Sequence, residues 1–286
     1  MHKTFGASPR DLIGFARIPI KYEDLLIREI ETSDPRGLQG VVRNPELHNL
    51  SHHLFTVGPS QDSRGRLVKD FASKTVFGLL WDRYLKQRTA EMEYFYNLFT
   101  GSPGTSVSAG WLFEARMHQL LARENTIQMF HIHGHRAKKN LIYSDYTASL
   151  GRNNPRSLQW TSSDHYTLPK DHTVELQEGH YYRPDSTSFP TIDSLLLFRP
   201  PGGSPPILLM FQITRNKAEH DVNPRGLREI NTLNFPSDAH RYYVVVTPEG
   251  VRPKITVPME HFKGQQGSPD ELFTVYHYPV YQLFTD

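Results

Sequence analysis

Four polar residues stand in segments that are otherwise apolar, and their types are suited to chemistry. Glu114 lies inside an amphipathic helical segment, and Asp193 lies at the start of an apolar run. Gln212 and Thr214 alternate with apolar residues at the end of the next apolar run. Side chains alternate along a strand, so Gln212 and Thr214 should point to one side of a sheet, with Asp193 beside them if the two strands are neighbours. Burying such a polar cluster is costly without hydrogen-bonding partners or a metal ion.

The elements that would position these residues can be predicted from hydrophobic periodicity. Apolar residues near helical spacing predict helices over 69–87, 89–99 and 108–124, and the glycines and proline of 101–106 separate the last two. Short candidate strands follow at 127–133, 141–146 and 173–177. The continuous apolar runs 191–198, 207–214 and 241–248 are typical of strands buried on both faces, with a helix between the last two at 224–233.

This order of elements predicts an α/β fold with a mixed central sheet flanked by helices, preceded by an N-terminal helical region. We expect the α/β domain to occupy 105–286. Residues 1–104 should form a mixed, partly helical linker or accessory region, and they could also be the tail of a preceding domain. A length of 286 residues and a hydrophobic content of 37% allow a sizeable core.

Composition excludes several classes of protein. The chain has no cysteine, which rules out a disulfide scaffold, a thiolate zinc site and a cysteine nucleophile. No stretch approaches the roughly 18 apolar residues that span a bilayer, so we expect no membrane partner. No Walker A loop, nucleophile elbow or dinucleotide fingerprint is present. The net charge of +2, with fifteen histidines, allows a polyanionic partner without requiring one.

Three motifs carry a resemblance to a known family. The segments AGWLFEARMHQLL (109–121), FPTIDSLLLF (189–198) and MFQITRNKAEHDVNPRGLREI (210–230) place a helical Glu, a strand Asp and a strand tripeptide in order. This arrangement resembles the PD-(D/E)XK nuclease superfamily, with its restriction-endonuclease fold. More narrowly, it is similar to the nuclease domain of Crinkler-type effectors and retrotransposon-hot-spot proteins. The resemblance covers about residues 108–247, and 1–107 match it only loosely.

The resemblance implies an endonuclease that hydrolyses phosphodiester bonds with the help of Mg²⁺ or Mn²⁺, with DNA favoured over RNA. Glu114, Asp193 and Gln212 would be the metal ligands, with oxygen donors suited to a hard cation. It also implies action inside a cell, with the nucleus as one compartment. An NTPase domain would precede this region in a longer protein.

The chain departs from the family pattern at two positions. Gln212 is neutral where a carboxylate is usual, so the site should bind a cation less tightly. Thr214 takes the place of the usual lysine and supplies no positive charge. His220, which matches the family pattern, or else Lys217 could fill that role. The alternative is a catalytically inactive, nuclease-like module that binds nucleic acid or a host protein.

Simpler interpretations exist for each residue. Glu114 could be an ordinary helix-surface residue, Asp193 a turn residue, and Gln212 with Thr214 an internal hydrogen-bonding pair. His220 alone is more often a loop histidine than a catalyst.

Two further motifs compete for attention. The histidines of His131-Ile132-His133-Gly134-His135 alternate and could bind zinc, but no further ligand stands at a telling spacing. Basic residues follow at once, so we favour a surface strand whose end meets phosphates. Pro184-Asp185 is a literal "PD" pair, yet polar residues follow it, which leaves Asp193 as the preferred ligand.

Overall fold

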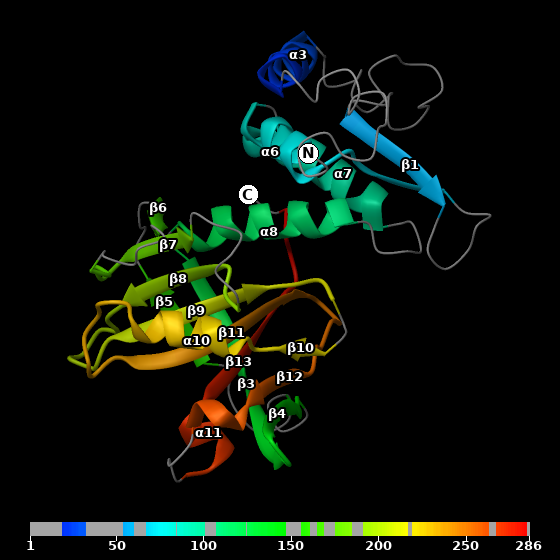
Figure 1. Ribbon diagram of the computed structural model, residues 1–286. Helices are drawn as coiled ribbons and strands as arrows, with labels where there is room; N and C mark the ends of the chain where they lie inside the picture. Colours follow the sequence, from blue (N-terminus) through cyan, green and yellow to red (C-terminus); the bar gives the residue numbers. More distant parts are fainter. Residues whose placement is uncertain are drawn as a thin grey trace. The chain divides into compact units, whose positions relative to one another are not determined.

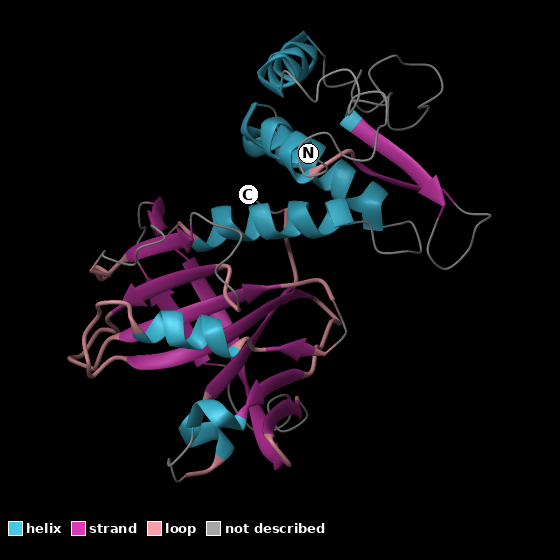
Figure 2. Cartoon of the chain, viewed as in Figure 1, coloured by secondary structure: helices cyan, strands magenta, loops and turns pink. Residues whose placement is uncertain are grey.

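The structure is a computed structural model that describes residues 19–32, 54–59, 67–83, 85–100, 107–123, 125–146, 156–160, 165–168, 175–184, 191–216, 219–262 and 267–284 (Figures 1 and 2). The chain divides into two compact units, Met1–Phe113 with Phe284–Asp286, and Glu114–Leu283. The boundary between them lies inside helix α8 (Val107–Leu121), whereas the sequence placed a division at 104/105.

The first unit contains helices and a hairpin. Strands β1 (Phe55–Pro59) and β2 (Leu67–Phe71) pair antiparallel. The helices are α3 (Pro19–Thr32), α6 (Lys74–Arg83) and α7 (Thr89–Thr100), with a 3-10 turn at Leu85–Gln87. The prediction of a helix from residue 69 was wrong at its start, because 67–71 pairs as a strand. Helix α6 begins only after Ser73, whose hydroxyl accepts a hydrogen bond from the amide of Val76.

Phenylalanine rings form the core of this unit. The ring of Phe71 lies with its centroid 5.4 Å from Phe55, 5.4 Å from Phe77 and 5.0 Å from Phe99. The hydroxyl of Ser108 accepts a hydrogen bond of 2.6 Å from the amide of Phe71. The amide of Ser108 donates to Asp70 at 3.0 Å, so the first turn of α8 is held by the end of β2.

The second unit is built on one large sheet. Among the described residues this sheet has eleven strands in the order β10-β12-β4-β3-β13-β11-β9-β8-β7-β6, and β5 pairs with β3. The strands are β3 (Asn125–Ala137), β4 (Asn140–Asp145), β5 (Arg156–Trp160), β6 (His165–Leu168), β7 (His180–Pro184), β8 (Ser194–Phe198), β9 (Ile207–Ile213), β10 (His220–Asp221), β11 (His240–Pro248), β12 (Ile255–Pro258) and β13 (Thr274–Val280).

The sheet is mixed. Strands β9, β11 and β13 run parallel to one another, whereas β8 is antiparallel to β9 and β3 is antiparallel to β13. All residues of β8 are buried, as are most of β9 and β11. The predictions of a mixed α/β architecture and of three buried central strands are therefore confirmed. Of the predicted strand at 173–177 the structure describes 175–177, where Glu175 forms an isolated bridge with Asn234.

Helix α10 (Pro224–Asn231) covers one face of the sheet (Figure 1). Its start is capped by Asn223, whose side chain accepts a hydrogen bond from the amide of Arg225. Leu227 and Ile230 of α10 pack into the main core cluster with Met210 and other buried residues of the central strands. The short helix α11 (Pro269–Leu272) packs on β3 and β13. No helix among the described residues is both long enough and apolar enough to cross a bilayer.

Candidate active site

Strand pairing places Asp193 beside Gln212. Asp193 directly precedes β8, and its amide donates a hydrogen bond of 2.8 Å to the carbonyl oxygen of Phe211 in β9. Its Oδ2 atom accepts hydrogen bonds from Gln212 Nε2 at 2.8 Å and from the amide of Ile213 at 2.6 Å. Hydrogen bonds to a charged acceptor contribute about 1.5–3 kcal/mol each, so this carboxylate is firmly oriented.

Glu114 approaches the same end of the sheet from helix α8. Its Oε1 atom lies 3.8 Å from Nη2 of Arg183 in β7 and 3.8 Å from Nε2 of His118. In the antiparallel pairing of β7 with β8, Tyr182 is opposite Leu195. Arg183 follows Tyr182 and Ser194 precedes Leu195, so the two residues are at the same end of this strand pair. Ser194 directly follows Asp193. The contact with Arg183 therefore places the carboxylate of Glu114 near the end of the sheet at which β8 begins.

Tyr181 links the two carboxylates electrostatically. Its hydroxyl donates to Ser194 Oγ at 2.7 Å and lies 2.6 Å from Nδ1 of His118. Because the Tyr181 hydrogen is used toward Ser194, the bond to His118 is donated by the imidazole Nδ1–H. Burial raises the pKa of Tyr181, the Ser194 bond and Arg183 oppose the rise, and the charges of Asp193 and Glu114 add to it.

Thr214 and His220 form a second pair at the end of β9. The Oγ1 atom of Thr214 lies 3.1 Å from Nε2 of His220 and accepts a hydrogen bond of 3.0 Å from the amide of Asn216. The amide of His220 donates a hydrogen bond of 2.7 Å to the carbonyl oxygen of Lys254. Burial lowers the pKa of His220, and neighbouring Asp221 only partly opposes this effect. The imidazole is therefore neutral at neutral pH.

The structure joins the predicted residues in two hydrogen-bonded pairs, Asp193 with Gln212 and Thr214 with His220. Glu114 lies beside Arg183 of β7 and His118 of its own helix. Lys217 lies outside the described residues. Sequence reasoning missed Arg183, whose Nη2 atom lies 3.8 Å from Oε1 of Glu114. Its only signal was its place beside aromatic residues in a short segment next to the Pro184-Asp185 pair.

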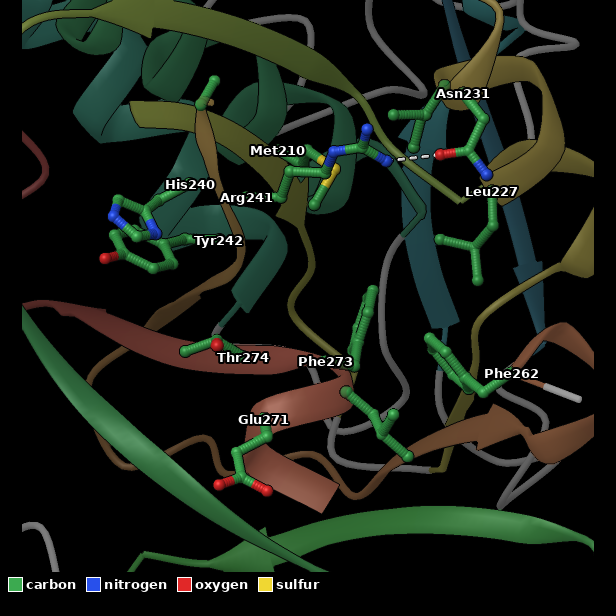
Figure 3. A pocket seen from close by; sticks show the side chains of 13 residues that line it. Met210, Leu227, Asn231, His240, Arg241, Tyr242, Phe262, Glu271, Phe273 and Thr274 are labelled. Carbon is green, nitrogen blue, oxygen red and sulfur yellow. Dashed lines mark hydrogen bonds between the residues drawn. The ribbon is translucent and has the colours of Figure 1, made fainter. Parts of the chain in front are cut away.

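A separate cavity of about 290 Å³ lies at the other end of the parallel strands (Figure 3). It is lined by the first residues of β11 and β13 and by parts of α10 and α11. Arg241 donates a hydrogen bond to Asn231 Oδ1 there, and its guanidinium lies 4.9 Å from the ring centre of Phe235. None of the predicted site residues lines this cavity, so it is distinct from the candidate active site.

The chain was compared with protein families, curated proteins and solved structures, and none of them matched it.

Proposed function

We propose that this chain is a metal-dependent endonuclease of the PD-(D/E)XK type, acting on DNA in preference to RNA. The observation that carries the proposal is the pairing of β8 with β9, which sets Asp193 beside Gln212. Glu114 lies 3.8 Å from Arg183 of β7, the strand that pairs with β8. Two carboxylates and an amide at one end of a buried mixed sheet agree with the order and the elements of the nuclease pattern. The restriction-endonuclease-like fold is part of this proposal.

The donor set fits a hard divalent cation. Glu114, Asp193 and Gln212 would hold Mg²⁺ or Mn²⁺ through oxygen atoms. Ligation through Oδ1 of Asp193 would keep both hydrogen bonds of its Oδ2 in place. The amide of Gln212 would present Oε1 while its Nε2 continues to orient Asp193. When bound, such an ion lowers the pKa of a water molecule and stabilises charge on a phosphate group.

The remaining residues would orient water and balance charge. The Thr214 hydroxyl, fixed by His220, can accept a hydrogen bond from a water molecule. A neutral His220 can accept a proton through that contact but supplies no positive charge. The side chain of Arg183 is 42% exposed and lies beside Glu114, so its guanidinium can also bind a phosphate group. In this proposal Arg183 supplies the positive charge of the usual lysine, whose position Thr214 occupies.

A second function, nucleic-acid binding without cleavage, is favoured by one observation. Glu114 Oε1 lies equally close to Arg183 and His118, at 3.8 Å from each. Arg183 competes with a metal ion for this carboxylate, and the neutral Gln212 adds no negative charge to offset this competition.

Plasmid nicking separates the two functions. The wild-type chain and the near-isosteric variants Glu114→Gln and Asp193→Asn are incubated with Mg²⁺, Mn²⁺ or EDTA, with RNA as a parallel substrate. We expect metal-dependent nicking that falls at least about 100-fold in both variants. Glu178→Gln is the matched control, because Glu178 also pairs with an arginine, Arg199, at 2.6 Å.

The outcomes are distinct when circular dichroism shows that each variant is folded. Nicking that persists in Asp193→Asn would remove the proposed role of this residue. Salt-sensitive DNA binding by the wild type with no nicking in either metal would support the second function.

A further inference from the structure

Two histidines of strand β3, His131 and His133, lie close to Asp270, which is distant in the sequence. His131 and His133 project to one side of β3, while Ile132 between them is buried in the main core cluster on the other side. The carboxylate of Asp270, in helix α11, lies against them. One ligand atom from each of His131, His133 and Asp270 can be chosen such that all three are within 4.8 Å of one another.

Hydrogen bonds hold the carboxylate of Asp270 in place. Its Oδ1 accepts a bond of 3.0 Å from the amide of Gly134, and its Oδ2 lies 3.0 Å from Nδ1 of His133. The bond from Gly134 is the kind of outer contact that fixes the direction of a metal ligand. The ring of His131 packs edge-on against His133, with centroids 4.4 Å apart, so both imidazoles have defined positions.

The backbone at this point is shaped to make the contact. The pairing of β3 with β4 shifts register between His133 and Gly134. A Cβ atom at Gly134 would come within 2.6 Å of the Tyr143 ring, so only glycine allows the close approach. The fully buried Tyr143 directs its hydroxyl to the carbonyl oxygens of Pro269 at 2.7 Å and Phe273 at 2.6 Å. Tyr143 thereby fixes both ends of the helix that carries Asp270.

We propose that His131, His133 and Asp270 form a binding site for a divalent transition metal ion of the Zn²⁺ type. Two imidazoles and one carboxylate are a ligand set that Zn²⁺ and Co²⁺ accept, and a solvent molecule completes a tetrahedral site. Ligand atoms around such an ion stand about 3.3 Å apart for bonds of 2.0–2.1 Å. His133 Nδ1 and Asp270 Oδ2, 3.0 Å apart, are already near this separation, and the ion would replace the proton that they share. The ligand atom of His131, which lies within 4.8 Å of the other two ligand atoms, needs to move inward.

The surroundings suit an ion that exchanges with solvent. The side chains of His133 and Asp270 are 36% and 29% exposed, so a water molecule can reach the open position.

This site is separate from the candidate active site. Three strands, β13, β11 and β9, lie between β3 and β8 in the sheet. Four inter-strand spacings of about 4.8 Å place the two sites roughly 19 Å apart. The metal site therefore goes beyond the proposed nuclease function and can be tested without any activity assay.

The test is calorimetric titration of the full, tag-free chain with Zn²⁺, with Co²⁺ absorption in the visible range as a report on geometry. Asp270→Asn is the informative variant, because Asn can still accept from Gly134 and donate to His133. His131→Gln removes a second ligand. His135→Gln is the matched control, since His135 is exposed and belongs to the same strand but not to the cluster.

We expect one Zn²⁺ per chain, with affinity at least tenfold lower in Asp270→Asn and His131→Gln and unchanged in His135→Gln. Zn²⁺ should raise the Tm of the wild type but not that of Asp270→Asn. Equal affinity in the wild type and Asp270→Asn, or no saturable binding by the wild type, would overturn the proposal. Asp193→Asn should retain Zn²⁺ binding, so that failure of the nuclease proposal and failure of this one are told apart.

Discussion

The side-chain amide of Gln212 donates a hydrogen bond of 2.8 Å to Oδ2 of Asp193, across the pairing of β9 with β8. The nuclease pattern has a carboxylate at the position of Gln212. Two carboxylates at this distance would repel unless a cation lay between them. The amide thus stabilises the strand ends without a metal ion. The site consequently has one negative charge fewer with which to bind a cation.

Replacing this amide by a carboxylate should make stability depend on a metal ion. In EDTA, Gln212→Glu should lower the free energy of unfolding by about 1–3 kcal/mol, because it exchanges a donor for a repelling acceptor. Mg²⁺ should restore the Tm, since it binds only the folded site. Thermal unfolding with Mg²⁺ and with EDTA measures both effects. Gln128→Glu, on an exposed position of β3, is the control and should change little. A Tm of Gln212→Glu that is the same in both conditions would contradict the prediction.

Tyr181 should be energetically coupled to Ser194. Tyr181→Phe removes a hydroxyl that serves two buried side chains, Ser194 and His118, and should cost about 1–3 kcal/mol in urea unfolding. Once Tyr181 is Phe, Ser194→Ala should cost less than it does in the wild type. A double-mutant cycle measures this difference, and strictly additive losses would show that the hydroxyl pair contributes nothing.

His277 should make the fold sensitive to acid. Burial lowers the pKa of His277 from 6.5 to about 4, Arg252 adds to the shift and the Val251 carbonyl opposes it. Its Nε2 atom lies 2.8 Å from the hydroxyl of Thr247. Between pH 6.5 and 4, His277 is protonated in the unfolded chain but stays neutral in the folded chain. The free energy of unfolding is therefore highest above pH 6.5 and decreases as the pH is lowered through this range. The loss specific to this group should be about 3 kcal/mol.

Urea unfolding at pH 7 and pH 4.5 of the wild type and of His277→Gln isolates this contribution, because the other histidines are common to both chains. The variant should lose less stability on acidification. A steeper loss in the variant would reverse the sign argued for His277.

Two glycines should respond in opposite directions to alanine. Gly134→Ala places a methyl group against the Tyr143 ring and should lower the free energy of unfolding by about 1–3 kcal/mol. At Gly110, inside α8, a Cβ meets nothing within 4 Å, so alanine should raise stability by about 0.5–1 kcal/mol. Chemical denaturation of the two variants checks the signs, and destabilisation of similar size at both positions would refute the steric argument for Gly134.

Local patterns sufficed to predict the centre of the fold. Long apolar runs identified β8, β9 and β11. The contact of Asp193 with Gln212 was expected on the condition that β8 and β9 are neighbours, which they are. The error at 69–73 has a physical cause. Phe71 belongs to a short strand, yet its distance from the apolar residues of α6 also fits a helical repeat, and five residues are too few to separate the two periods.

Contacts between distant segments could not be predicted in this way. His133 and Asp270 are 137 positions apart, and no periodicity connects a strand to a four-residue helix that closes over it much later. Arg183 was missed for the same reason, since its relation to Glu114 depends on the pairing of β7 with β8 and on the place of α8. The pKa of His220 depends on burial, which its own segment does not reveal.

The place of β13 in the sheet has a consequence for biosynthesis. This strand follows all other strands of the sheet along the chain, yet it lies between β3 and β11. During synthesis, the described strands on the β3 side and those on the β11 side cannot be joined into one sheet until residues 274–280 leave the ribosome. Closure then joins segments more than a hundred residues apart, which is a slow, late step with an exposed strand edge on each half. A newly made chain would therefore need protection from aggregation until its last strand is inserted.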